Sequence, residues 1–94
     1  MALLSDYEIE HRLSEMDEWH LTRTGEIERD IQLADFASAL EFVNRVGALA
    51  EQANHHPDIL LHGWNKVRLT LMTHSEGGLT EADFSLAVAI DVLS

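Results

Sequence analysis

The single proline of this 94-residue chain, Pro57, sets the end of its longest helical pattern. Asp35 can cap a helix that we expect to run to Asn54. A helix cannot continue through a proline, and the residue before a proline prefers extended geometry. His56 should therefore leave the helix while His55 stays on or beside it, so that the two imidazoles point in different directions. The apolar residues with helical spacing predict one inward-facing stripe: Phe36, Ala39, Leu40, Val43, Val46, Gly47, Ala50 and Ala53.

The segments before this helix predict a short helix and a hairpin. Ser5 and Glu8 form a capping-box pattern, and the apolar residues behind it recur at helical spacing. Residues 19–22 and 27–33 alternate as two strands that are parted by a turn. Arg29 falls on the apolar side of the second strand, so it needs a partner or an edge position.

The segments after the long helix predict two more strands. Residues 59–61 are strand-like, and a turn over residues 63–66 leads into a stretch that alternates apolar and polar residues up to Met72. That alternation is typical of a sheet that is buried on one face. Strict alternation places His74 with Met72, away from the buried face, although a bulge at the strand end could turn it toward His55. Both orientations of His74 stay open at this point.

A third helix closes the chain. Thr80 and Asp83 form a second capping-box pattern, and residues 84–93 behind them are apolar almost all round. The element order α-β-β-α-β-β-α predicts an α+β fold, with one small domain over residues 1–94 and a four-stranded antiparallel sheet that carries three helices on one face. Residues two apart on a helix lie on nearly opposite sides, so the third helix cannot direct all its apolar side chains at one sheet. We therefore expect a homodimer or homotetramer, with this helix or an edge strand at the contact.

Composition narrows the classes of function. A chain of 94 residues with 46% hydrophobic content fits one small domain, and the absence of cysteine excludes disulfides and thiolate metal sites. No signal segment or apolar run of membrane-spanning length is present, so we expect a cytoplasmic protein without a membrane partner. The net charge of −11 argues against direct nucleic-acid binding, which needs Lys and Arg to neutralise phosphates.

Ionisable groups gather where the long helix ends. Histidine exchanges a proton near neutral pH, since its unperturbed pKa is about 6.5. Glu51 lies one helical turn before His55, where its carboxylate could orient the ring and favour its protonated form. Taken alone, the His55–His56 pair is equally well explained as a capped helix end without chemistry. A metal site of His55, His56 and His74 is less favoured, because structural zinc sites usually have four ligands, often cysteines.

The series Glu51-x3-His55-His56-Pro57-x6-Trp64-x9-His74-x8-Asp83 resembles the pattern of the pterin-4a-carbinolamine dehydratase family (4a-hydroxytetrahydrobiopterin dehydratases). The resemblance covers roughly residues 6–93 and implies the same α+β architecture. It also implies an enzyme that converts a 4a-hydroxytetrahydropterin, the 4a-carbinolamine, to quinonoid dihydropterin and water in tetrahydrobiopterin recycling. By this resemblance, the catalytic residues are His55, His56 and His74, and the residues that bind or orient the substrate are Glu51, Pro57, Trp64 and Asp83.

The same resemblance implies a partner but no cofactor. The pterin is the substrate, no metal is implied, and an aromatic amino acid hydroxylase is the pathway partner that would supply the carbinolamine. His55 and His74 become the candidates for general acid and base, and His56 a group that binds substrate and stabilises a proton. Which histidine handles which proton stays open.

Several of these residues also have a purely structural interpretation. Glu51 could be a solvated helix residue, Asp83 is first a helix cap, and Trp64 is more simply a hairpin aromatic that covers the edge of the core. Trp19 is expected to pack against the first helix. The remaining histidines, His11, His20 and His62, match no position of the series and are expected on the surface or in strands. The alternative function is a non-enzymatic dimerisation or assembly partner of the transcriptional coactivator type, which would use helical surface rather than the histidines.

Overall fold

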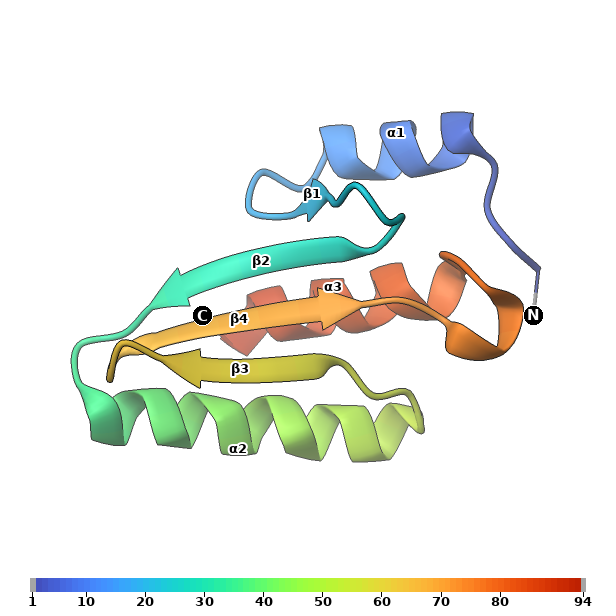
Figure 1. Ribbon diagram of the computed structural model, residues 1–94. Coiled ribbons are helices and arrows are strands. Elements are labelled where there is room, and N and C mark those ends of the chain that lie inside the picture. Colours follow the sequence, from blue (N-terminus) through green and yellow to red (C-terminus); the bar gives the residue numbers. More distant parts are fainter. Residues whose placement is uncertain (1, 94) are drawn as a thin grey trace.

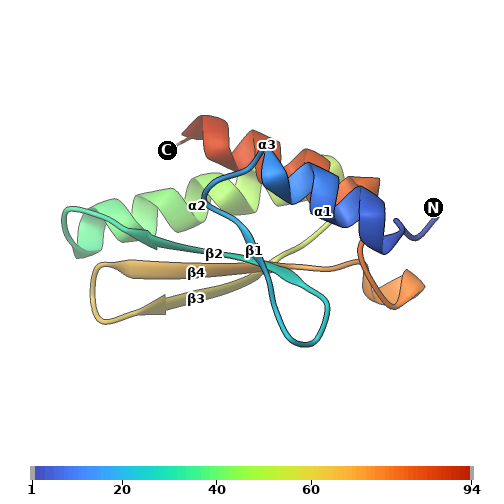
Figure 2. The same cartoon turned by 90° about the horizontal axis from the view of Figure 1, so that it is seen from above.

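In the computed structural model, which describes residues 2–93, one antiparallel sheet carries all the helices on the same side (Figures 1 and 2). The elements follow the order α-β-β-α-β-β-α, with one short 3-10 turn, η1, ahead of the last helix. Their bounds are α1 Asp6–Ser14, β1 His20–Leu21, β2 Ile27–Gln32, α2 Phe36–Ala53, β3 Asp58–His62, β4 Lys66–Leu71, η1 His74–Glu76 and α3 Glu81–Leu93. The predicted fold class is therefore confirmed.

The four strands are arranged in the order β1-β2-β4-β3, and each neighbouring pair is antiparallel. The inward side chains of the central strand β4, Val67, Leu69 and Leu71, are fully buried, as their alternation predicts. The first strand is shorter than predicted, because β1 has only two residues and pairs with Ile27 and Glu28 alone. Within the described chain, the rest of β2 has no strand on its outer side.

The predicted inward stripe of α2 is partly wrong. The buried residues are Ala39, Phe42, Val46 and Ala50, so Phe42 belongs to the core although the predicted stripe omitted it. Phe36 and Leu40, by contrast, are 49% and 43% exposed. The physical reason is that a single narrow line of the helix faces the sheet and α3, so residues on the flanks of the stripe reach solvent.

The C-terminus of α2 is set by Asn54 rather than by the proline. Asn54 adopts the left-handed conformation (φ 50°, ψ 42°), and its N–H donates to the carbonyl of Glu51. The N–H of His55 donates back to the carbonyl of Ala50 over 3.1 Å. These two bonds make a Schellman cap, which closes the helix one full turn before Pro57 could interrupt it. His55 is therefore already outside the helix.

Arg29 has the partner that its place in the strand requires. The side chain is buried on the inner face of β2, and its Nη1 lies 2.6 Å from Asp91 Oδ1 of α3. The same oxygen accepts a hydrogen bond from Trp19 Nε1 at 2.9 Å. Trp19 is 4% exposed and hydrogen-bonds α3, which explains why β1 begins only after it.

The helix starts follow the predicted capping patterns. Glu8 N–H donates to Ser5 Oγ, Ser5 N–H donates to Glu8 Oε1, and Ser38 N–H donates to Asp35 Oδ1 at 2.7 Å. The Arg12 guanidinium binds both carboxylate oxygens of Glu81 and so connects α1 to α3. None of the helices in residues 2–93 has the length and apolar character needed to cross a membrane.

Candidate active site

His55 forms the best-defined contact among the predicted site residues. Its Nε2 lies 2.6 Å from Oδ1 of Asp83, and the two side chains are 15% and 0% exposed. The Schellman cap positions the ring, because the chain reverses at Asn54 and directs the next side chain toward the first turn of α3. Twenty-eight residues of sequence separate the two partners, so the fold itself brings them together.

Asp83 is held from three sides. Its Oδ2 accepts hydrogen bonds from Thr73 Oγ1 at 2.8 Å and from the backbone N–H of Thr80 at 2.9 Å. The bond from Thr80 is the capping-box contact predicted for α3. The Thr73 hydroxyl has one proton and gives it to Asp83, so the Thr80 hydroxyl donates in turn to Thr73 Oγ1 over 2.8 Å. Both oxygens of the fully buried Asp83 carboxylate are therefore hydrogen-bonded.

This arrangement determines which atom of His55 is available for chemistry. An ionised Asp83 can only accept, so Nε2 of His55 carries a hydrogen and donates it. Nδ1 is then the atom that takes up a proton in the neutral ring or gives one up in the imidazolium.

The predicted pairing of Glu51 with His55 is wrong. Glu51 Oε2 lies 2.5 Å from Nε2 of His56 instead, and these side chains are 77% and 56% exposed. The cause is again the left-handed turn at Asn54, which carries His55 away from the surface of α2 and returns His56 over its last turn. His56 therefore has a carboxylate partner at the surface, whereas His55 has one in the interior.

His74 opens η1, directly after Thr73. Thr73 continues the inward alternation of β4 and is buried, whereas the side chain of His74 is exposed. Among residues 2–93, no hydrogen bond joins the His74 ring to His55 or His56. Thr73 nevertheless links the two regions, because it bonds Asp83 while its chain neighbour is His74. The end of α2, η1 and the start of α3 lie at the same end of the molecule (Figure 1).

A family model described as “Pterin 4 alpha carbinolamine dehydratase” matches residues 2–93. The chain belongs to this family. A relative from Acidobacterium capsulatum, named “Putative pterin-4-alpha-carbinolamine dehydratase”, is 50% identical over 93 residues, which is 99% of each chain. A relative of the same name from Roseiflexus castenholzii is 54% identical over 91 residues, covering 96% of this chain and 95% of its own.

Two solved structures share the architecture. A transcriptional coactivator/pterin dehydratase from Brucella melitensis superposes with a TM-score of 0.91 at 31% identity, over 98% of both chains. A pterin dehydratase-like protein, described as a RuBisCO assembly factor of the alpha-carboxysome, gives a TM-score of 0.68 at 24% identity, over 81% of this chain and 88% of its own. The second likeness shows the fold alone.

Not every residue of the series from Glu51 to Asp83 lies at the end of the molecule where α2 ends and α3 begins. Trp64 lies in the turn between β3 and β4, has a φ of 61° and is 61% exposed, so the predicted role as a cover for the core edge is wrong. This turn is at the opposite end of the sheet from η1 (Figure 1). Within one chain, Trp64 therefore lies away from His55, His56 and His74. Pro57 lies between His56 and the start of β3 and is half-buried.

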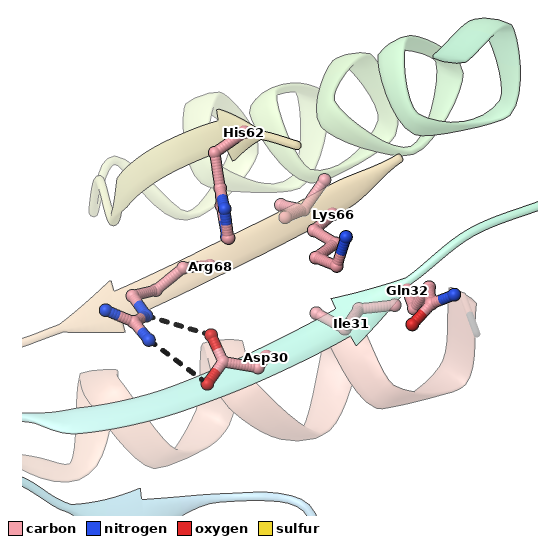
Figure 3. Close-up of a pocket in the computed structure, with 7 residues that line it drawn as sticks. Asp30, Ile31, Gln32, His62, Lys66 and Arg68 are labelled. Carbon is pink, nitrogen blue, oxygen red and sulfur yellow. Dashed lines mark hydrogen bonds and ion pairs between the residues drawn. The ribbon is translucent and has the colours of Figure 1, made fainter. Parts of the chain in front are cut away.

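His62 belongs to a separate hollow on the open face of the sheet. The hollow has a volume of about 370 Å³, and Figure 3 shows the side chains of His62, Lys66 and Arg68 among those that line it. Arg68 is engaged by Asp30, with Nε 2.8 Å from Oδ1, which holds the pKa of Asp30 below its usual range. Within residues 2–93, no hydrogen bond or ion pair joins the residues that line this hollow to the Asp83 network, which makes His62 a suitable control residue.

Sequence reasoning missed Thr73. Its buried hydroxyl is a direct hydrogen-bond donor to the buried carboxylate, yet threonine is common in strands and carries no motif signal. Extending the inward alternation of Val67, Leu69 and Leu71 by two residues would have identified it. Among residues 2–93, no three His, Asp or Glu side chains are grouped so that they could hold a metal ion.

Proposed function

We propose that this family member is a dehydratase that converts 4a-hydroxytetrahydropterin to quinonoid dihydropterin and water. The observation that carries the proposal is the contact of the His55 ring with the buried carboxylate of Asp83. A buried acid with three donors around it holds one imidazole in a single orientation, which a positioned acid or base requires. Family membership over residues 2–93 supports the same substrate class.

The reaction needs two proton transfers and no change of oxidation state. The C4a–O bond breaks with its electron pair on the hydroxyl, which takes a proton and leaves as water. A proton leaves the neighbouring ring nitrogen, and a carbon–nitrogen double bond forms between the two atoms. An imidazole is suited to each of these two transfers at neutral pH, and a well-placed acid or base contributes about 10²–10⁴-fold.

The three histidines then have different tasks. His55, fixed by Asp83, and His74, at the exposed start of η1, are the acid and base candidates; Asp83 bonds Thr73, the residue before His74. His56, held at the surface by Glu51, assists in binding the polar edge of the pterin. The carbinolamine would come from an aromatic amino acid hydroxylase, so the protein would act in tetrahydrobiopterin recycling.

A dehydration assay tests this proposal. The 4a-carbinolamine is generated by a hydroxylase, the protein is added at micromolar concentration without metal, and the quinonoid product is followed by absorbance. We expect dehydration clearly faster than the spontaneous rate. A spontaneous rate that stays unchanged would remove the enzyme proposal.

One observation favours a second candidate, an assembly partner for another protein. Apolar side chains remain exposed on the helical layer, with Val88 at 55% and Val92 at 82% on α3 and Phe36 and Leu40 on α2. The description of the Brucella protein as a transcriptional coactivator/pterin dehydratase points the same way. An inactive protein whose partner binding survives loss of His55 would support this candidate instead.

A further inference from the structure

Thr73 lies where β4 passes into the turn η1, and its backbone closes that turn. The carbonyl of Thr73 accepts hydrogen bonds from the N–H groups of Glu76 and Gly77, each at 3.0 Å. The N–H of Thr73 donates to the Gly78 carbonyl at 2.9 Å. Gly77 has a φ of 74°, a left-handed value that glycine adopts without strain. Both backbone groups of Thr73 therefore hold the loop that begins with His74.

The side chain of Thr73 faces the interior and joins two fully buried groups. Its Oγ1 lies 2.8 Å from Asp83 Oδ2 and 2.8 Å from Thr80 Oγ1. An ionised carboxylate can only accept, and the Thr73 hydroxyl has a single proton, so the Thr80 hydroxyl supplies the proton of the second bond. The hydroxyl of Thr80 therefore directs the proton of Thr73 at Asp83.

The plane of the Asp83 carboxylate depends on what its two oxygens contact. The last torsion of an aspartate side chain has a broad energy minimum, so the carboxylate rotates easily unless it is held. Oδ1 contacts His55 Nε2, and Oδ2 accepts from Thr73 Oγ1 and from the N–H of Thr80. Thr80 lies three residues before Asp83 at the start of the same helix, whereas Thr73 comes from the end of β4. Thr73 thus ties the carboxylate to the sheet.

We propose that Thr73 is a positioning residue of the site, whose hydroxyl keeps the Asp83 carboxylate in the plane that orients the His55 ring. Its role in catalysis rests on the proposed dehydratase function. Its backbone holds the loop of His74 at the same time, so one residue sets the placement of both acid and base candidates. Thr73 acts through other side chains and need not touch the pterin.

Nuclear magnetic resonance tests the role of the hydroxyl without any activity measurement. Long-range ¹H–¹⁵N spectra, recorded at a pH where the His55 ring is neutral, give the ratio of the Nε2–H to the Nδ1–H tautomer. The contact with Asp83 selects the Nε2–H form. In Thr73→Val this ratio should fall about threefold or more, the change that corresponds to the loss of one hydrogen bond. Thr73→Ser, which keeps the hydroxyl, should retain the wild-type ratio.

Kinetics then test the role in catalysis. In the dehydration assay, Thr73→Val should lower kcat about threefold or more with little change in KM, because the residue acts on a proton-transfer group. Thr73→Ser should stay close to wild type. Added to His55→Ala, Thr73→Val should have no further effect, which is the sign of coupling through that ring. Circular dichroism checks that each variant is folded at the temperature of the assay.

The matched control is Thr70→Val, the same substitution three residues earlier in the chain. Thr70 Oγ1 donates to Glu28 Oε2 at 3.2 Å on the open face of the sheet, so its loss should leave the His55 ratio and kcat unchanged. Three results would each overturn the inference and leave the dehydratase proposal intact: an unchanged His55 ratio in Thr73→Val, a Thr73→Ser variant as impaired as Thr73→Val, or losses that add to those of His55→Ala. An inactive wild type whose His55 ratio still changes in Thr73→Val would instead remove the dehydratase proposal and keep the positioning role.

Discussion

His55 and His56 are adjacent in the sequence but have different surroundings. The ring of His55 is mostly buried and bonded to a carboxylate that is itself fixed by two further donors. The ring of His56 is 56% exposed, and its partner Glu51 is more exposed still. An exposed ion pair contributes little free energy, whereas a buried carboxylate holds its partner in one geometry. We therefore expect His55 to keep its position in solution and His56 to move.

Replacing the histidines one at a time tests their roles. His55→Ala and His74→Ala should each lower turnover about 10-fold or more with the fold intact, as loss of a positioned acid or base does. His62→Ala should leave turnover unchanged, because His62 lies in the hollow on the open sheet face. Turnover is measured in the dehydration assay and folding by circular dichroism. Equal losses of turnover in all three variants would contradict the assignment of His55 and His74 as the acid and base.

The Thr73 hydroxyl offers a test of the buried network that leaves every charge in place. Thr73→Val keeps the shape but removes the donor to Asp83 Oδ2, so the free energy of unfolding should fall by about 1–3 kcal/mol. Urea unfolding measures the change. The control is Thr70→Val on the same strand, where the hydroxyl bonds Glu28 on the open face and its loss should cost clearly less. Similar losses at both positions would show that the network contributes no more than a surface bond.

Sequence reasoning named both His55 and Asp83 but did not predict that they contact each other. The spacing of the series pointed to Asp83, but its contact with His55, 28 positions earlier in the sequence, could not be predicted from that spacing. Glu51 was assigned to His55 because helical periodicity assumes that the helix continues, and one left-handed residue was enough to shift the partner to His56. Asparagine is tolerated in that conformation, so Asn54 was the signal that reasoning from the proline overlooked.

At the scale of elements, the end of α2 depends on Asn54. Asn54→Gly should keep the free energy of unfolding, because glycine adopts a left-handed φ without strain. Asn54→Ala should lower it by about 1 kcal/mol, since the left-handed conformation costs about that amount and alanine lacks the short polar side chain whose local hydrogen bonding lets asparagine adopt it. For a domain of this size the loss corresponds to about 4–8 °C in Tm, measured by thermal unfolding. An alanine variant as stable as the glycine variant would contradict the assigned cap.

The contact of α1 with α3 should depend on pH. The Arg12 guanidinium bonds Glu81 and holds the pKa of that carboxyl below its usual range. A lowered pKa in the folded state stabilises the protein above the unfolded value, and that contribution disappears as pH falls through the folded value. Arg12→Gln should therefore lower the free energy of unfolding at pH 7, by less than about 1 kcal/mol because the pair is partly exposed.

The same comparison repeated in acid supplies the decisive measurement. As the pH falls below the usual range of glutamate, wild type and Arg12→Gln should converge in urea unfolding. Arg23→Gln is the control, since no ion pair of Arg23 is found among residues 2–93, and its effect should not vary in this way. A gap between wild type and Arg12→Gln that persists in acid would show that the guanidinium stabilises through packing over Phe84 instead.

The order and type of the helices and strands could be predicted from local sequence patterns, whereas the burial of their residues could not. Capping pairs at Ser5, Asp35 and Thr80 are short-range chemistry and are all present in the structure. The predicted inward stripe of α2 omitted the buried Phe42. Periodicity identifies a face of a helix but does not say how wide its contact with the core will be. The short β1 reflects the contact of Trp19 with Asp91, 72 residues away, which no local pattern contains.

At the scale of the whole molecule, we predict a symmetric homo-oligomer. A single chain exposes Val88 and Val92 on α3, and the outer side of β2 beyond Glu28 has no neighbouring strand in residues 2–93. Apolar strips and open strand edges of this kind are usually covered in soluble proteins. Light scattering at low micromolar concentration should give at least twice the chain mass of 10.6 kDa. A clean monomer with α3 folded would contradict this prediction and leave the site unaffected.

The double use of Asp83 has a consequence for engineering. Many active sites trade stability for activity, so substitutions that stabilise such enzymes often reduce their turnover. Here one carboxylate caps α3 through Oδ2 and orients His55 through Oδ1. A substitution of Asp83 that removes the carboxylate therefore removes the cap of α3 together with the contact that orients His55. Selection for thermal tolerance alone would therefore keep this position unchanged, and stability and activity would rise and fall together at it.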